Sequence, residues 1–254
     1  MLLNDFVAAM ERIAPPELAM DFDNVGLLVS PATEEIRRVL VALDCSVAVA
    51  QEAARLKVDL VLTHHPVMLF GVKRMLRNHP DTAAVYRLIQ SGVGLYAAHT
   101  NLDAAEHGVN DALAERLELI DVRPLPPENL GRIGRLREPV TLKEFAAKTE
   151  RALSCTALAT GEPAAMVRMV ALVGGSGGSD VAAAAATGAD VFVTGECKHH
   201  EALAAAVLGM NVLTCGHYET ERVVLPALIA RLQTLQNDVQ YYVTLAEASP
   251  QRRL

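Results

Sequence analysis

The stretch Val61-Leu62-Thr63-His64-His65-Pro66 is an apolar run that ends abruptly in two adjacent histidines. Adjacent residues of a continuing strand point to opposite faces, so both imidazoles can serve one site only if the strand stops and the backbone turns. Pro66 is consistent with such a stop, because it lacks a backbone donor and holds the preceding residue in extended geometry. We therefore expect a buried strand that delivers His64 and His65 at its C-terminal end, where open α/β sheets keep their sites.

The chain around this strand is repeated. Residues 39–63 and 170–194 both run through a strand, a loop, an Ala-rich helix and a second apolar strand that ends in Thr. This order predicts an α/β protein (α+β in some schemes) built of two related lobes. Residues 121–130 contain three prolines and are the predicted linker. We expect residues 1–124 with 215–254 to form the first lobe and 125–214 the second.

Composition narrows the class of protein. The 254 residues carry a net charge of −7, with 4% aromatic residues and no Trp. Both features argue against a nucleic-acid surface, which needs cations for phosphates and rings for bases. The N-terminus lacks the pattern of a signal peptide, and the sequence has no apolar run long enough to span a membrane. The four cysteines form no C-x-x-C pair and are interpreted as reduced thiols, so we expect a cytoplasmic protein with no membrane partner.

Imidazoles and carboxylates gather at the predicted strand ends. In each half, the strand that follows the repeated unit leads to a histidine with a carboxylate four positions later: His99 with Asp103, and His217 with Glu221. Such mixed nitrogen and oxygen donors suit Zn, Fe, Mn, Co or Ni. A carboxylate can also bridge two ions of a hydrolytic centre. The candidate ligands are His64, His65, Asp103, His217 and Glu221.

Three further patterns give weaker signals. His199 and His200 follow a Gly-Glu-Cys-Lys turn, where a helix-cap or pocket-lining role is favoured over ligation. The glycine loop 174–179 places backbone N–H groups at a helix start, which suits an anion, but it lacks the G-K-[ST] pattern, so a tight turn is the favoured interpretation. Cys197, close to these two histidines, is a poor candidate for a nucleophile.

Several short blocks resemble the signature blocks of the NIF-three-like family, whose members are also called type 2 homologues of GTP cyclohydrolase I. The blocks are Asp23-Asn24-Val25-Gly26-Leu27, Leu62-Thr63-His64-His65-Pro66, His99-Thr100-Asn101-Leu102-Asp103, Gly108-Val109-Asn110-Asp111, Thr194-Gly195-Glu196 and Gly216-His217-Tyr218-Glu219-Thr220-Glu221. They occur in the family's order from about Asp5 to Leu235. Phe22 departs from the Trp common in the family at that position, which affects packing rather than the ligands.

The resemblance implies a two-lobed NIF-three-like fold in its compact form, without an inserted domain. It also implies a toroidal homohexamer and one dinuclear centre per chain, with two divalent metal ions bound by His64, His65, Asp103, His217 and Glu221. His99 falls where the family has a histidine near the metals, and we expect it to move protons.

The resemblance leaves the reaction open. The favoured hypothesis is a metal-dependent hydrolase that opens a cyclic C–N bond in a nucleotide, similar to a type 2 GTP cyclohydrolase, with a hydroxide that bridges the two metals as nucleophile. The alternatives are a metal-storage or metal-delivery chaperone, and an adaptor with a structural metal. Five ligands for two ions leave open coordination positions, which favours the hydrolase, since structural sites are usually closed. The sequence names neither the metal nor the substrate.

Overall fold

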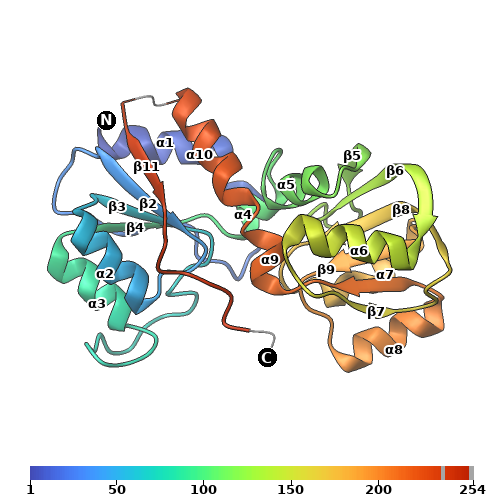
Figure 1. Ribbon diagram of the computed structural model, residues 1–254. Helices are drawn as coiled ribbons and strands as arrows, with labels where there is room; N and C mark the ends of the chain where they lie inside the picture. Colours follow the sequence, from blue (N-terminus) through green and yellow to red (C-terminus); the bar gives the residue numbers. More distant parts are fainter. Residues whose placement is uncertain (236–237, 252–254) are drawn as a thin grey trace. The chain divides into compact units, whose positions relative to one another are not determined.

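The computed structural model describes residues 1–235 and 238–251, and the chain divides into two compact units (Figure 1). Unit 1 consists of Met1–Glu106 and Leu225–Leu254, and unit 2 consists of His107–Val224. Each unit has a mixed sheet covered by helices, which confirms the predicted α/β class.

Unit 1 is built on a sheet with the order β1-β4-β3-β2-β11, in which β1 alone runs antiparallel to its neighbour. Its strands are β1 (Gly26–Val29), β2 (Arg38–Ala42), β3 (Leu60–Thr63), β4 (Gly94–Ala97) and β11 (Gln240–Val243). Its helices are α1 (Leu3–Ile13), the 3-10 helix η1 (Pro16–Leu18), α2 (Val47–Leu56), α3 (Ala83–Ser91), α4 (Thr100–Ala104) and α10 (Val224–Leu235), whose first residue belongs to unit 2.

Helices cover both faces of this sheet. Leu40 and Leu95 point to one face, where they join a buried cluster with residues of α2 and α3. Tyr96, the next residue of β4, points to the opposite face and meets Phe6 of α1 edge to face, with ring centroids 6.0 Å apart. Because both faces are covered, all four residues of β3 are buried, as expected for a central parallel strand.

Unit 2 is built on a sheet with the order β5-β6-β8-β9-β10-β7, in which β8, β9 and β10 run parallel. Its strands are β5 (Ile120–Pro124), β6 (Arg132–Thr141), β7 (Leu158–Thr160), β8 (Met166–Val173), β9 (Val191–Thr194) and β10 (Asn211–Thr214). Its helices are α5 (Val109–Arg116), α6 (Leu142–Leu153), the 3-10 helix η2 (Gly178–Asp180), α7 (Val181–Ala186), α8 (His199–Leu208) and α9 (His217–Glu221).

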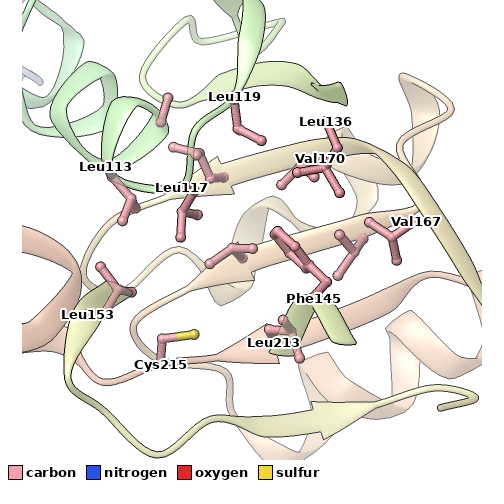
Figure 2. Packing of buried hydrophobic residues seen from close by; sticks show 14 of the residues in the cluster. Leu113, Leu117, Leu119, Leu136, Phe145, Leu153, Val167, Val170, Leu213 and Cys215 are labelled. Carbon is pink, nitrogen blue, oxygen red and sulfur yellow. The ribbon is translucent and has the colours of Figure 1, made fainter. Parts of the chain in front are cut away.

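Strand β8 shows how the second core is divided. Val170 and Leu172 enter a cluster with Phe145 of α6 and with the end of β10 (Figure 2). The alternate residues Ala171 and Val173 enter a second cluster with residues of α7 and α8. The alternation of side chains along a strand therefore gives this sheet two apolar faces, and each face is covered by helices.

The predicted repeat is present in the two sheets. The strands β2, β3, β4 and β1 have the same order and directions as β8, β9, β10 and β7. Asp59, which precedes β3, accepts two backbone N–H bonds of 2.8 Å at the start of β2. Asp190, which precedes β9, accepts the same pair within β8, at 2.8 and 2.7 Å. The repeat thus extends to individual hydrogen bonds.

The proline-rich segment 121–130 is not a linker. Its first residues belong to β5, an edge strand that pairs antiparallel with β6, and Pro124 lies at the end of β5, where a missing donor is tolerated. Helix α5 also contacts β6 and β8. Residues 107–124 therefore group with unit 2, and the two compact units divide after Glu106 and Val224, whereas the sequence predicts boundaries after residues 124 and 214.

Candidate metal centre

The end of β3 brings its two histidines to the same side. Backbone pairing with the chain after β2 continues through the N–H groups of His64 and His65, which bond to Ala42 O at 3.2 Å and Leu43 O at 2.9 Å. The two imidazole rings nevertheless lie only 4.8 Å apart, centroid to centroid. The backbone therefore turns after Thr63, as the sequence predicted.

His99 reaches the same place from the neighbouring strand. It caps the N-terminus of α4, directly after β4, and β4 pairs in parallel with β3. Its ring lies 5.2 Å from that of His64 and 5.5 Å from that of His65. Each of the three rings has one nitrogen that lies within 4.8 Å of a nitrogen of each other ring. These three nitrogens are close enough to share a metal ion.

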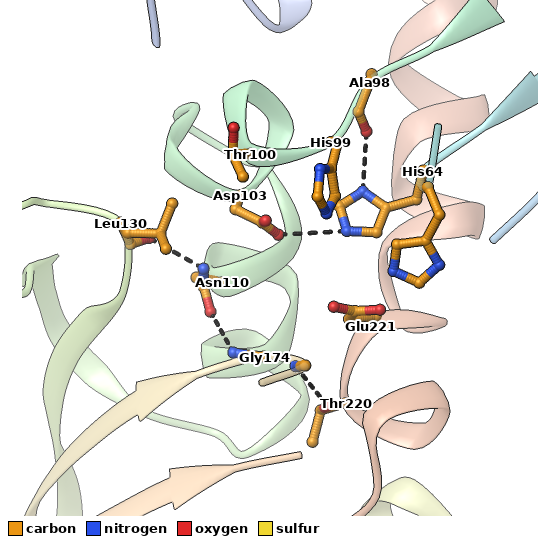
Figure 3. Close-up of polar contacts among 12 residues, drawn as sticks. His64, Ala98, His99, Thr100, Asp103, Asn110, Leu130, Gly174, Thr220 and Glu221 are labelled. Atoms are coloured by element: carbon orange, nitrogen blue, oxygen red, sulfur yellow. Dashed lines mark hydrogen bonds and ion pairs between the residues drawn. The ribbon is translucent and has the colours of Figure 1, made fainter. Parts of the chain in front are cut away.

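Each of these histidines has an acceptor at Nδ1. His64 Nδ1 donates to Ala98 O at 2.8 Å (Figure 3). The corresponding nitrogens of His65 and His99 donate to the carboxylates of Asp44 and Asp23, both at 2.9 Å. An acceptor at Nδ1 keeps the proton there and leaves the lone pair of the neutral ring on Nε2. Protein ligands of metal ions are oriented in this way, and the partner also raises the basicity of the ring.

Asp23 is held as an anion. Its side chain is buried, while that of His99 remains 20% exposed. Burial would raise the pKa of Asp23, but hydrogen bonds from His99 and Thr100 outweigh that effect and hold the pKa well below its usual range. The carboxylate therefore offers His99 Nδ1 a permanently negative acceptor.

Asp103 approaches His64 from the first turns of α4. Its Oδ1 lies 3.5 Å from His64 Nε2, and its side chain is 13% exposed (Figure 3). The lone-pair nitrogen of His64 and a carboxylate oxygen thus face one another. Imidazole nitrogen and carboxylate oxygen are both metal-ligand atoms, so this arrangement suits two ligands of one cation.

Unit 2 presents a second pair on α9. His217 and Glu221 are four residues apart, so they share one face of the helix, and His217 Nε2 lies 3.1 Å from Glu221 Oε2. His217 Nδ1 lies 3.0 Å from Glu196 Oε1, so this ring also has a carboxylate partner at Nδ1. Glu221 is almost fully buried, a costly position for a carboxylate unless cations or donors surround it.

The repeated His-x-x-x-carboxylate spacing does not occupy equivalent positions in the two units. Ala98 and Cys215 are equivalent, because their N–H groups bond to the last residues of β3 and β9 in the same way. His99 therefore corresponds to Gly216, and His217 lies one position further along its helix. For this reason His99 turns toward Asp23, whereas His217 faces its own helix partner, Glu221.

The glycine loop 174–179 is a tight turn whose backbone N–H groups bond to side chains. The N–H groups of Gly174 and Gly175 donate to Asn110 Oδ1 at 2.8 Å and Thr220 Oγ1 at 3.0 Å (Figure 3). Gly177 N donates to Thr194 Oγ1 at 3.0 Å. These donors are already used within unit 2, which supports the tight-turn interpretation over anion binding.

His199 and His200 are exposed on the first turn of α8. Glu201 caps that turn by accepting from Lys198 N at 2.6 Å. This position agrees with a helix-start role for both histidines. All four cysteines are free thiols, as expected, and burial raises the pKa of Cys197, which disfavours a nucleophile at that position.

The structure brings together His64, His65, His99 and Asp103 in unit 1, and His217 with Glu221 in unit 2. The sequence reasoning missed the carboxylates that orient the rings, namely Asp23, Asp44 and Glu196. A signal was present for two of them: Asp44 precedes His65, and Glu196 precedes His217, by the same 21 positions.

Within residues 1–235 and 238–251, none of the helices combines the length and the apolar character needed to cross a membrane.

Comparison with known proteins agrees with the geometry. Residues 1–251 match the model of the family Duf34/NIF3 (NGG1p interacting factor 3). A Streptomyces coelicolor protein named "GTP cyclohydrolase 1 type 2 homolog" is 37% identical, and the alignment covers 86% of this chain and 81% of the relative. A Clostridium perfringens protein of the same name is 32% identical, with 98% of each chain covered. The crystal structure of a Staphylococcus aureus hypothetical protein has a TM-score of 0.92 at 26% identity, covering 100% of this chain and 99% of that one. The chain belongs to the Duf34/NIF3 family.

Proposed function

We propose that the chain binds two divalent metal ions in one dinuclear centre and uses them to hydrolyse a cyclic C–N bond in a nucleotide. The proposed ligands are His64, His65, Asp103, His217 and Glu221. His99 is proposed as the group that moves protons. We further propose a toroidal homohexamer, as the family resemblance implies, and a cytoplasmic location.

The observation that carries the proposal is the common orientation of the histidines. His64, His65 and His217 each have a hydrogen-bond acceptor at Nδ1, namely the Ala98 carbonyl, Asp44 and Glu196. A partner at Nδ1 is typical of imidazoles that bind a metal ion through Nε2. Three examples, each beside a carboxylate or another imidazole, favour metal binding.

The donor set fits the proposed ions. Imidazole nitrogens and carboxylate oxygens suit Zn, Fe, Mn, Co or Ni, and the set contains no thiolate to favour softer ions. Held by these residues, two metal ions would lower the pKa of a water molecule and so supply a hydroxide nucleophile near neutral pH, which hydrolysis of the substrate ring requires.

The residues of the chain supply the remaining chemistry. The partial exposure of His99 allows it to reach a substrate, while the buried carboxylate of Asp23 keeps the Nδ1 side of the ring occupied. His99 can therefore take up and release a proton at Nε2.

The name shared by several relatives, "GTP cyclohydrolase 1 type 2 homolog", supports GTP as the first substrate to test. The protein is loaded separately with Zn, Mn, Fe, Co and Ni, and formate release and ring opening are followed with GTP and related nucleotides. The proposal predicts turnover that is lost in His64→Ala and in Glu221→Ala.

A metal-loaded protein that opens none of these rings would contradict the hydrolase proposal. Exchange of the bound metal with a chelator within minutes, in a protein without turnover, would support the metal-delivery alternative instead. Dissociation of an oligomer on metal removal would support a structural metal.

A further inference from the structure

Residues 244–247, which follow β11, are held against unit 1, and we call this segment the C-terminal strap. Thr244 N continues the pairing with β2 by bonding to Val41 O at 2.9 Å. The buried carboxylate of Glu52, on α2, then accepts from the Thr244 hydroxyl and from the N–H groups of Leu245 and Ala246, at 3.1 and 3.2 Å. The strap is therefore held by several bonds at a defined place beside the end of β2.

Glu247 lies at the end of this strap and binds the backbone that follows β2. Its Oε2 accepts from Leu43 N at 2.9 Å, and its Oε1 accepts from Asp44 N at 2.6 Å. Both oxygens of one carboxylate thus hold two successive backbone groups. Burial raises the pKa of Glu247 even though these two N–H donors lower it, so the fold keeps a carboxyl group there at a cost.

Asp44 links this backbone to the candidate metal centre. Its carboxylate accepts from His65 Nδ1 at 2.9 Å, but its side chain is 57% exposed. The N–H group of Asp44 bonds to Glu247 at 2.6 Å, so Glu247 helps to set the position from which the Asp44 carboxylate reaches His65.

In unit 2, side-chain oxygens also accept from the equivalent backbone N–H groups. Ala42 pairs with Thr63 and Val173 pairs with Thr194, so Gly174 and Gly175 correspond to Leu43 and Asp44. Their N–H groups also donate to side-chain oxygens, those of Asn110 and Thr220 (Figure 3). In both units, side-chain oxygens therefore accept from the backbone N–H groups of the two residues that follow the first repeated strand. In unit 1, the acceptor is Glu247 of the C-terminal strap.

We infer that Glu247 is a positioning residue for His65, acting through Asp44, so that the C-terminal strap completes the orientation of one proposed metal ligand. The inference rests on the proposed metal centre for its functional meaning. Its structural content, the control of the His65 tautomer, can be tested without metal.

The first test uses the metal-free full-length protein. The nitrogen chemical shifts of His65 are measured by NMR in the wild type, Asp44→Asn, Glu247→Gln and Glu247→Ala. Glu144→Gln serves as the control, because Glu144 is another carboxylate that accepts a backbone N–H, from Thr141 at 2.8 Å in unit 2. The inference predicts a single Nδ1–H tautomer in the wild type and the control, and a mixture of tautomers in the other three variants. Unchanged His65 shifts in both Glu247 variants would overturn it.

The second test is a double-mutant cycle on Zn²⁺ affinity. Loss of a partner that orients a ligand weakens metal binding by about 10–100-fold, which we expect for Asp44→Asn. Glu247→Gln should weaken binding several-fold, and the double variant should bind as Asp44→Asn does, because both changes act on one path. Fully additive losses would show that Glu247 acts elsewhere and would overturn the inference.

The two tests separate this inference from the proposed function. If the wild type binds no metal, but Glu247→Gln still alters the His65 tautomer, the proposed function fails and the positioning role stands. If the wild type binds metal, and Glu247→Gln changes neither the tautomer nor the affinity, the positioning role fails and the proposed function stands.

Discussion

Gly175 lies directly against the carboxylate of Glu221: a Cβ atom at Gly175 would come within 2.1 Å of Glu221 Oε1 and 3.0 Å of His217 Nε2. Gly175 also has a φ of +62°, which L side chains rarely adopt. The glycine loop therefore leaves space for two proposed ligands, the first and the last residue of α9. This role explains the loop better than the binding of an anion.

Gly175→Ala should displace Glu221 and His217 and weaken Zn²⁺ binding by about tenfold or more, since ligand placement controls affinity. The matched control is Gly188→Ala, whose φ of +75° carries a similar strain of about 1–2 kcal/mol but whose Cβ would meet nothing within 4 Å. Calorimetric titration and thermal melts separate the two effects. Equal Zn²⁺ affinities in the two variants would show that the space at Gly175 does not matter.

Asp23→Asn should lower turnover while leaving the metal content unchanged. The substitution replaces the carboxylate that accepts from His99 Nδ1 by an amide, so the ring is held less firmly in its orientation and proton transfer slows. Turnover and metal content are measured on the same preparation, with Asp21→Asn as a control on the same turn. Loss of metal from Asp23→Asn would instead identify His99 as a ligand.

Asp59 and Asp190 should make similar contributions to stability, one in each unit. Each accepts two backbone N–H bonds from the neighbouring strand, so an alanine leaves two donors without these partners and costs about 1–3 kcal/mol. Urea unfolding of Asp59→Ala and Asp190→Ala checks this, with Glu115→Ala on exposed α5 surface as control. A cost for only one of the two would show that the repeat does not share this interaction.

The capping box of α6 should make stability depend on pH. Thr141 and Glu144 cap one another, and hydrogen bonds from Thr141 lower the pKa of Glu144. A pKa lowered in the folded state means that the contribution is present above the unfolded pKa and is lost as pH falls through the folded pKa. Thr141→Ala should therefore destabilise the protein at neutral pH and destabilise it less in acid.

Urea unfolding at a series of pH values measures this difference. Glu138→Gln, at an exposed carboxylate of β6, should retain the pH dependence of the wild type. A cost for Thr141→Ala that stays constant into the acid range would contradict the assignment to Glu144.

The sequence was sufficient to predict the repeat and the strand ends, because both depend on local patterns. Apolar runs such as Val39–Leu43 and Asp59–Leu62 fall on β2 and β3, and the stop after Thr63 follows from Pro66 and the adjacent histidines. The short strand β7 was missed, since three residues give no periodicity. β5 was mistaken for a linker because prolines are tolerated at a sheet edge.

The carboxylates that orient the rings could not be predicted with the same ease. Asp23 lies 76 positions before His99 in a segment that resembles an ordinary turn, and only the fold brings the two together. Glu247 depends on the path of the C-terminal strap, which carries no periodic signal. Such long-range hydrogen bonds are set by tertiary structure rather than by local propensity.

The measurement that tests the central claim most directly is the metal content of protein purified without added metal and then saturated with Zn²⁺ or Mn²⁺. We predict about two metal equivalents per chain in the wild type and a marked loss in His64→Ala and in Glu221→Ala. Less than one equivalent in the wild type, unchanged in both variants, would contradict the dinuclear centre.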